Sequence, residues 1–316
     1  MRPGYAIGSY RGEHLTGVLD VLRDALPCDP VSRSVFVRKA LLDPNFDPDG
    51  GRVAVVEGNV AGFALALVRR FALEDAPPEV GVGWITLLGV RTDHRHAGIG
   101  SALLDDAERF LVSRGCRTAA ISPYAPGYFT PGVDEQACAQ GLAFLQKRGY
   151  EVVSRPIAME CDLAAIRMPS WLSGREAALA AQGTHVVPYT PELIPALFAF
   201  LGEHFRGDWQ RFARTAIDRI EQGEAPTRVW LATCGDSVIG FSHHEVERFG
   251  PIGVHPHERG RGIGHLLMYR TLESMRLQGL HCAWFLWSDE RTADRLYRAA
   301  GFRITRRFAI LRKEIG

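Results

Sequence analysis

Lysine is scarce in this chain of 316 residues, which contains only Lys39, Lys147 and Lys313, and none of them lies beside a glycine-rich loop. A nucleotide-binding loop of the Gly-Lys-Ser/Thr type is therefore excluded. No run of about 18 apolar residues is present, so we expect no segment that spans a bilayer. Residues 1–10 lack the apolar stretch of a signal peptide, and we expect a cytoplasmic protein.

Paired cysteines and a strong charge bias are also missing. The six cysteines form no Cys-x-x-Cys pair and no cluster with histidine at zinc-ligand spacing, so we expect reduced thiols and no metal site. The formal net charge of +1 gives no reason to expect a nucleic acid or an anionic membrane as a partner. The length and the 46% hydrophobic content are typical of a globular protein of two domains.

An internal repeat divides the chain into halves. The segment from Val90 to Leu103 has the pattern Val-x-x-x-x-Arg-x-x-Gly-Ile-Gly-x-x-Leu, and the segment from Val254 to Leu267 has the same pattern. A strand-like run precedes each copy, and apolar residues at helical spacing follow it. A match of this length at the same place in both halves indicates a tandem repeat.

Each half shows the same order of expected elements: strand, two helices, three antiparallel strands, helix, strand, helix, strand. Pro169 and Gly174 favour a linker between the halves. The sequence therefore predicts an N-terminal domain at 1–163, a linker at 164–182 and a C-terminal domain at 183–316. Each is expected to be an α/β (α+β) domain in which helices flank a mixed, mostly antiparallel sheet.

A glycine-rich loop between a strand and a helix is suited to binding phosphate. The free N–H groups of the first helical turn point at the loop, and glycines let the backbone approach the phosphate oxygens. An arginine before the glycines adds charge-assisted hydrogen bonds. A dinucleotide-dependent oxidoreductase is a distant alternative, because its Gly-x-Gly-x-x-Gly pattern is broken by His96 in the first loop and His265 in the second.

The Arg-x-x-Gly-x-Gly loop, in this element order, resembles the acyl-CoA loop of the GNAT superfamily of N-acetyltransferases. The run from Val254 to Gly264 fits closely, and so does the later run Ala293-x-x-Leu296-Tyr297-x-x-x-Gly301-Phe302. The resemblance covers nearly the whole chain, twice, as in tandem members of the superfamily. It implies direct transfer of an acetyl group from acetyl-CoA to an amine.

The resemblance also implies which residues bind acetyl-CoA. The strand before each loop would hold pantetheine through its backbone, at Leu88 and Val90 and at Ile252 and Val254. An N–H group near Ile252 could polarise the thioester carbonyl. The loops would hold the pyrophosphate through Arg95, His96, Ala97, Gly98, Ile99, Gly100 and Ser101, and through Arg259, Gly260, Arg261, Gly262, Ile263, Gly264 and His265.

For the chemical step, the resemblance implies that Tyr297 is the general acid that protonates the leaving thiolate. Its ring could also be a core aromatic, because it shares a helical face with apolar neighbours, but the matched motif favours the acid role. The family often has an asparagine seven residues earlier, where this chain has Glu290. The first copy has Leu145 at the tyrosine position, so it lacks the acid unless Tyr124 or Tyr128 substitutes. We therefore expect catalysis in the second copy.

No motif identifies the base that deprotonates the amine. Glu247 is the candidate, and Glu245, His243 and His244 are alternatives that lie beside it in the sequence. The segment Glu203–Trp209 mixes carboxylates with aromatics, which suits a cationic amine but also an ordinary turn.

The first copy has an insertion around Tyr124–Asp134, whose three aromatics would pack either on a ligand or on the other domain.

The leading hypothesis is thus an acetyl-CoA-dependent N-acetyltransferase that acts on a primary amine of a small molecule, with catalysis in the C-terminal domain. The alternative is a non-catalytic protein that binds or senses acyl-CoA. No metal, nucleic acid or membrane partner is expected, and the sequence does not determine the oligomeric state.

Overall fold

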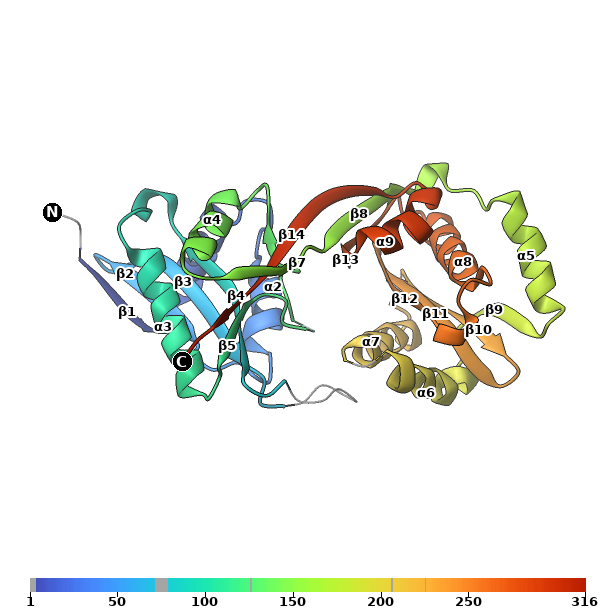
Figure 1. Ribbon diagram of the computed structural model, residues 1–316, viewed down its shortest axis with the longest axis horizontal. Coiled ribbons are helices and arrows are strands. Elements are labelled where there is room, and N and C mark those ends of the chain that lie inside the picture. Colours follow the sequence, from blue (N-terminus) through green and yellow to red (C-terminus); the bar gives the residue numbers. More distant parts are fainter. Residues whose placement is uncertain (1–3, 72–78, 126, 206, 225) are drawn as a thin grey trace. The chain divides into compact units, whose positions relative to one another are not determined.

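Figure 1 shows a computed structural model of the chain. The structure describes residues 4–71, 79–125, 127–205, 207–224 and 226–316. These residues divide into two compact units. The first unit comprises residues 4–71, 79–156 and 306–316, and the second comprises residues 157–305.

The first unit is built on a mixed sheet with the strand order β1-β2-β3-β4-β5-β14. Neighbouring strands are antiparallel except β4 and β5, which are parallel. The short strands β6 and β7 pair with β14. The strands are β1 (Tyr5–Ser9), β2 (Gly51–Val56), β3 (Asn59–Val68), β4 (Val82–Val90), β5 (Thr118–Ile121), β6 (Val133–Asp134), β7 (Glu151–Ser154) and β14 (Arg303–Glu314).

Helices cover both faces of this sheet. On one face, α1 (Leu15–Ala25) and α2 (Arg33–Phe36) pack in a core that contains Phe36, Phe63 and Trp84. On the other, α3 (Ile99–Ser113) and α4 (Ala139–Lys147) pack in a second core. Because β3 is buried on both faces, its central residues are continuously apolar instead of alternating.

The second unit repeats this plan with the strand order β8-β13-β12-β11-β10-β9, in which only β12 and β13 are parallel. Helices α6 and α7 pack on one face, and α8 packs on the other with α5 beside it (Figure 1). The elements are β8 (Ile157–Asp162), α5 (Ser170–Ala180), β9 (Thr184–Pro188), α6 (Ile194–His204), α7 (Trp209–Glu221), β10 (Thr227–Cys234), β11 (Ser237–Glu245), β12 (Arg248–Val254), α8 (Ile263–Leu277), β13 (Cys282–Ser288) and α9 (Glu290–Thr292).

The predicted fold class is confirmed, because each unit is a mixed, mostly antiparallel sheet flanked by helices. The compact units differ from the predicted 1–163 and 183–316 at their final strands. β8, expected to close the first domain, pairs with β13, and β14 joins the first sheet from Arg306 onward. Both strands contain buried apolar residues, and their sequences do not specify which sheet they complete.

The segment 164–182, expected to be a linker, contains the helix α5 and belongs to the second unit. Leu172 and Leu179 are buried in the same core as α8, and Glu176 forms an ion pair with Arg270 of α8. Pro169 precedes the helix as its N-cap residue, and Gly174 lies within it. The helix forms despite Gly174 because the burial of two leucines outweighs a propensity cost of about 1 kcal/mol.

Candidate active site

The two repeated loops have the same backbone conformation. Gly98 and Gly262 are the N-cap residues of α3 and α8, with φ angles of 90° and 92° in the left-handed region that glycine adopts without strain. Each loop arginine folds back onto the preceding strand. The Nε of Arg95 donates to the carbonyl of Val90 at 3.4 Å, and that of Arg259 donates to the carbonyl of Val254 at 3.1 Å. The Nε groups of both arginines therefore help to shape the loops.

A second left-handed position precedes each N-cap. Gly260 has a φ of 82° in the second loop, and His96 has a φ of 61° at the equivalent place in the first. The first loop thus keeps the geometry without the glycine, at a cost of about 1 kcal/mol. The histidine that breaks a dinucleotide pattern in the sequence does not break the phosphate-binding shape.

In the first unit, β4 and β5 pair from Val82 to Ile85 on β4 and then separate. The rest of β4, from Thr86 to Val90, lines a cavity of about 1050 Å³ together with the first loop. A cavity at the upper end of the usual size range for ligand sites can take a coenzyme arm and a small acceptor. Of the residues predicted to bind the coenzyme here, the lining contains Leu88, Val90, Arg95, His96, Gly98, Gly100 and Ser101.

Two predicted residues of the first loop point away from this cavity. Ile99 is buried in the core beneath α3, and Ala97 packs against the same core. Their side chains stabilise the loop, so only their backbone atoms can contribute to binding.

The insertion of the first unit forms part of the cavity wall, with Phe129, Thr130 and Asp134 in the lining. Its tyrosines are used elsewhere. The hydroxyl of Tyr124 is fully buried, where it donates to Asp43 at 2.9 Å and accepts from Asn45 at 2.7 Å. Neither Tyr124 nor Tyr128 is among the lining residues, whereas Leu145 is. The first cavity therefore has a leucine where the family places its acid.

In the second unit, β12 and β13 pair at Arg248 and Trp284 and separate beyond them, as β4 and β5 do. Ile252 and Val254 lie on the separated part of β12. Pro251 has no N–H, so Ile252 is the first residue after it that can offer one to a thioester carbonyl.

Aromatic side chains cover β12 at Gly253, the residue that corresponds to Gly89 of β4 in the repeat. The rings of Phe205 and Trp209 are stacked with centroids 4.4 Å apart, and they pack directly on Gly253. A Cβ atom placed on Gly253 would lie 2.4 Å from the Cζ of Phe205, whereas at Gly89 the nearest atom is the Cβ of Ala25. The aromatic residues of the segment Glu203–Trp209 therefore line the strand, and its residue 206 lies outside the described residues.

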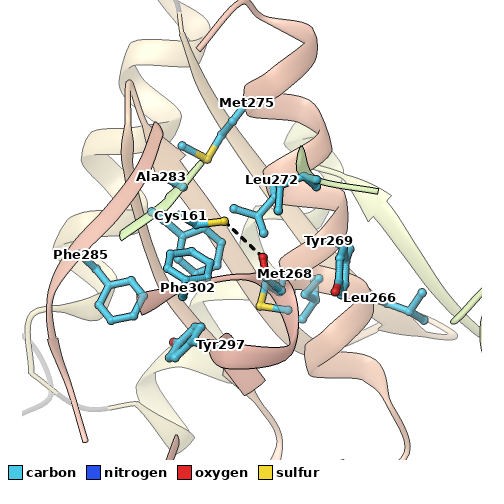
Figure 2. Packing of buried hydrophobic residues seen from close by; sticks show 14 of the residues in the cluster. Cys161, Leu266, Met268, Tyr269, Leu272, Met275, Ala283, Phe285, Tyr297 and Phe302 are labelled. Atoms are coloured by element: carbon cyan, nitrogen blue, oxygen red, sulfur yellow. Dashed lines mark hydrogen bonds between the residues drawn. The ribbon is translucent and has the colours of Figure 1, made fainter. Parts of the chain in front are cut away.

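Tyr297 ends a helical turn that begins at Ala293. Its ring contacts Phe249 of β12 and Phe285 of β13, which each follow directly the residue at which the two strands pair. Figure 2 shows its ring beside Phe285 and Phe302, with centroids at 4.6 Å and 5.5 Å. The side chain is 7% exposed, and its hydroxyl makes no hydrogen bond with any residue that the structure describes. Burial raises the pKa of Tyr297, and the charge of Asp289 adds to this, so the phenol is protonated at neutral pH.

The carboxylates proposed as bases have partners inside the fold. Glu247 accepts from the N–H groups of His281 and Cys282 at 3.4 Å and 3.3 Å, and Glu245 forms an ion pair with Arg219. Glu247 therefore helps to hold the start of β13. The role of Glu247 as the base stays a prediction, and it would require release of these N–H groups.

His243 and His244 are buried on opposite faces of β11. Burial lowers the pKa of His243 to about 3 and that of His244 to about 4, and the positive charges of Arg248 and Arg228 respectively add to the shifts. His244 contacts the carbonyl of Val246 and Gln278, and the Nδ1 of His243 has no partner in the described chain. Both are neutral near pH 7, and neither is exposed to a substrate.

These histidines should make folding sensitive to acid. Their folded-state pKa values lie below the unfolded value of about 6.5, so the unfolded chain binds more protons once the pH falls below 6.5. Stability should fall from pH 6.5 towards pH 4, by about 2 kcal/mol per histidine at pH 5. Denaturant unfolding at pH 7 and pH 5 measures this loss. It should shrink in His244→Gln, and an equal loss in that variant would contradict the assignment.

Within the described parts of the chain, no helix is long and apolar enough to cross a membrane, and no three His, Cys, Asp or Glu side chains gather in a way that could hold a metal ion.

One functional candidate was missed from the sequence. Trp171 and Arg175 of α5 lie against the second loop. The pair Leu172 and Leu179, two helical turns apart, is the pattern that could have revealed this helix.

Comparison with known proteins identifies the family of both units. The chain matches the model of the acetyltransferase (GNAT) family at residues 18–125 and that of an acetyltransferase (GNAT) domain at residues 225–304. It is 27% identical over 301 residues to the mycothiol acetyltransferase of Thermobifida fusca (strain YX), with 76% of this chain and 91% of that protein covered.

Two solved structures share the fold. One is a tandem GNAT protein from the clavulanic acid biosynthesis pathway, at 18% identity and a TM-score of 0.64, with 99% of both chains covered. The other is the glucosamine N-acetyltransferase region of a fungal multi-domain β-N-acetylglucosaminidase, at 19% identity and a TM-score of 0.77. It covers 99% of this chain, which spans only 38% of that protein.

The two family matches lie one in each unit and contain the repeated loops and the strands before them. Together they cover more than half of the chain, in the same tandem layout as the clavulanic acid pathway protein. The chain belongs to the GNAT family of acetyltransferases, carries its domain twice, and is an N-acetyltransferase.

Proposed function

We propose that this chain transfers the acetyl group of acetyl-CoA to a primary amine of a small molecule, and that the transfer takes place in the second unit. The observation that carries the second part is Tyr297, whose ring is buried while its hydroxyl has no partner in the described chain. An unpaired phenol at the point where two strands separate is available to a thiolate held between them.

The reaction follows from the groups on β12 and the turn after β13. With acetyl-CoA along β12, the N–H of Ile252 polarises the thioester carbonyl. The amine nitrogen attacks the carbonyl carbon, the carbon–sulfur bond breaks, and the sulfur leaves as a thiolate. Tyr297 gives its proton to the sulfur, and the proton lost by the amine restores the phenol through water.

The raised pKa of Tyr297 does not prevent this step. A thiolate released beside this buried phenol also loses part of its hydration, which raises its affinity for a proton. Burial therefore raises the proton affinity of donor and acceptor in the same direction.

The proposed small-molecule acceptor is supported by Phe205 and Trp209. Their stacked rings cover the strand at Gly253, which leaves little width for a folded protein segment and offers flat apolar walls to a compact amine. The similar fungal structure is described as a glucosamine N-acetyltransferase region, so an amino sugar belongs among the first compounds to test.

In the first unit, we propose that the loop and β4 bind acetyl-CoA in the cavity of about 1050 Å³. The loop conformation matches that of the second unit, and Leu145 stands in place of the acid. Non-catalytic binding of acyl-CoA, the alternative for the whole chain, would then describe this half alone.

A panel of amines tests both parts of the proposal. Glucosamine, a diamine and an amino acid are incubated with acetyl-CoA, and mass spectrometry identifies the acetylated product. Arg259→Ala should lower kcat/KM about tenfold or more through loss of a charge-assisted contact, and its repeat partner Arg95→Ala should leave the turnover nearly unchanged. The reverse result would place the reaction in the first unit, and coenzyme binding without turnover of any amine would favour the sensing alternative.

A further inference from the structure

The helix α5 places two unused side chains against the second loop. Trp171 and Arg175 are four residues apart and therefore share one face of the helix. The ring of Trp171 lies edge-on to His265, with centroids 5.5 Å apart. The Cγ and Nε of Arg175 lie 2.9 Å and 3.7 Å from the position that a Cβ atom on Gly262 would occupy.

Contacts along α5 and just after its end hold the helix against the second unit. Leu172 and Leu179 anchor α5 in the core, and Glu176 accepts from the Nη2 of Arg270 on α8 at 2.8 Å and 3.0 Å. Beyond the end of α5, Gln182 accepts from Arg261 of the loop at 2.7 Å. Trp171 and Arg175 are thus presented to the loop by a helix that is fixed to it.

The charge around Gly262 is not balanced by the protein. Arg261 is neutralised by Glu258, but Arg175 makes no ion pair or hydrogen bond with a described residue. It lies beside the N-terminus of α8, a helix of 15 residues whose dipole is positive there. Because Arg175 is exposed at this positive helix end, its guanidinium is available to an anion that binds there.

Among the described residues of the first unit, no arginine lies at the position that corresponds to Arg175, within 4 Å of a Cβ atom on Gly98. The nearest atom to the equivalent position of Gly98 is the hydroxyl of Tyr5, at 3.6 Å. A neutral phenol therefore stands where the second unit has a guanidinium.

The geometry points to Trp171 and Arg175 as the site for the adenosine-phosphate end of acetyl-CoA in the second unit. Arg175 pairs with a phosphate of the coenzyme, and Trp171, which is 53% exposed, offers its indole to the adenine ring. This inference rests on the proposed coenzyme site at the second loop. It assigns to α5 the selection of a nucleotide-bearing acyl donor over a bare pantetheine thioester.

Calorimetric titration with CoA, 3′-dephospho-CoA and pantetheine tests the assignment in an Arg95→Ala background, which weakens the first loop. Arg175→Ala should raise the Kd for CoA about tenfold, and Trp171→Ala should do so to a similar extent. Neither variant should change the weak binding of pantetheine. If the effect of Arg175→Ala disappears with 3′-dephospho-CoA, the partner is the 3′-phosphate, and if it persists, the partner is the pyrophosphate.

Arg303→Ala is the matched control, because Arg303 is a surface arginine of the same unit whose side chain is 78% exposed. An equal change in Arg303→Ala and Arg175→Ala would reduce the effect to overall charge and overturn the inference. Tighter binding in Arg175→Ala would also overturn it, since α5 would then be a plug in the loop. Failure of Arg259→Ala to weaken CoA binding would instead contradict the proposed coenzyme site itself.

Discussion

Deletion of residues 306–316 should unfold the first unit while the second unit stays folded. The deleted segment carries most of β14, which pairs with β5, β6 and β7 of the first sheet. Its buried side chains include Phe308, Ile310, Leu311 and Ile315. At about 1.5–3 kcal/mol for each large apolar side chain, their loss is comparable to the whole stability of a domain.

Polar contacts of the same strand add to this loss. Arg306 forms ion pairs with Asp29 and Asp134 in the wall of the first cavity, and Lys313 forms one with Glu108 of α3. Without the strand, three carboxylates lose their partners in or near the core. The cavity wall and the helix that follows the first loop would both lose support.

Hydrogen exchange followed by mass spectrometry can observe the two units separately. In the truncated chain, peptides from residues 4–71 and 79–156 should lose protection, and those from 157–305 should keep it. Phe308→Ala is a milder version and should cost about 3–5 kcal/mol in the first unit, whereas Arg312→Ala, exposed on the same strand, should change stability by less than about 0.5 kcal/mol. Retained protection of the first unit after truncation would contradict the strand assignment.

The sequence was sufficient to predict the fold of each unit, because the repeated Arg-x-x-Gly-x-Gly loop and the apolar spacing are local signals. It was insufficient for the partners of β8 and β14, because strand pairing depends on contacts between residues far apart in the chain. The same limit explains α5, whose proline and glycine favoured a linker while its two buried leucines stabilise a helix.

The site was predictable to a similar degree. The repeated loops lead into α3 and α8, as the repeated pattern indicated, and Leu145 lines the cavity of the first unit. The roles of these residues toward acetyl-CoA stay predictions. The partners of Glu247 were not predictable, since main-chain N–H groups have no sequence signature. Nor could the sequence show that the first unit contains the cavity of about 1050 Å³, while Tyr297 lies in the second unit.

Tyr297→Phe should lower kcat by about a hundredfold or more, with little change in the affinity for acetyl-CoA. The substitution keeps the ring between Phe285 and Phe302 and removes only a hydroxyl that has no partner in the described chain. Stability should therefore change little, because no hydrogen bond is lost. We expect the rate to fall because the leaving thiolate no longer receives a proton from residue 297.

Tyr269→Phe is the matched control for this change. Tyr269 is another buried tyrosine of the second unit, and its hydroxyl donates to the carbonyl of Ala299 at 3.3 Å. Removing that hydroxyl should cost about 1 kcal/mol of stability and leave the rate of transfer unaffected. Comparison of the two variants distinguishes the general effect of removing a buried tyrosine hydroxyl from the specific effect of removing the proton donor.

The rate of a single turnover at saturating acetyl-CoA and amine, compared among the natural chain, Tyr297→Phe and Tyr269→Phe, tests the central assignment most directly. We expect a rate about a hundredfold lower in Tyr297→Phe alone. If a Tyr297→Phe chain folds, binds acetyl-CoA and transfers the acetyl group at the natural rate, Tyr297 is not the acid. The cavity of the first unit would then be the next place to look for the reaction.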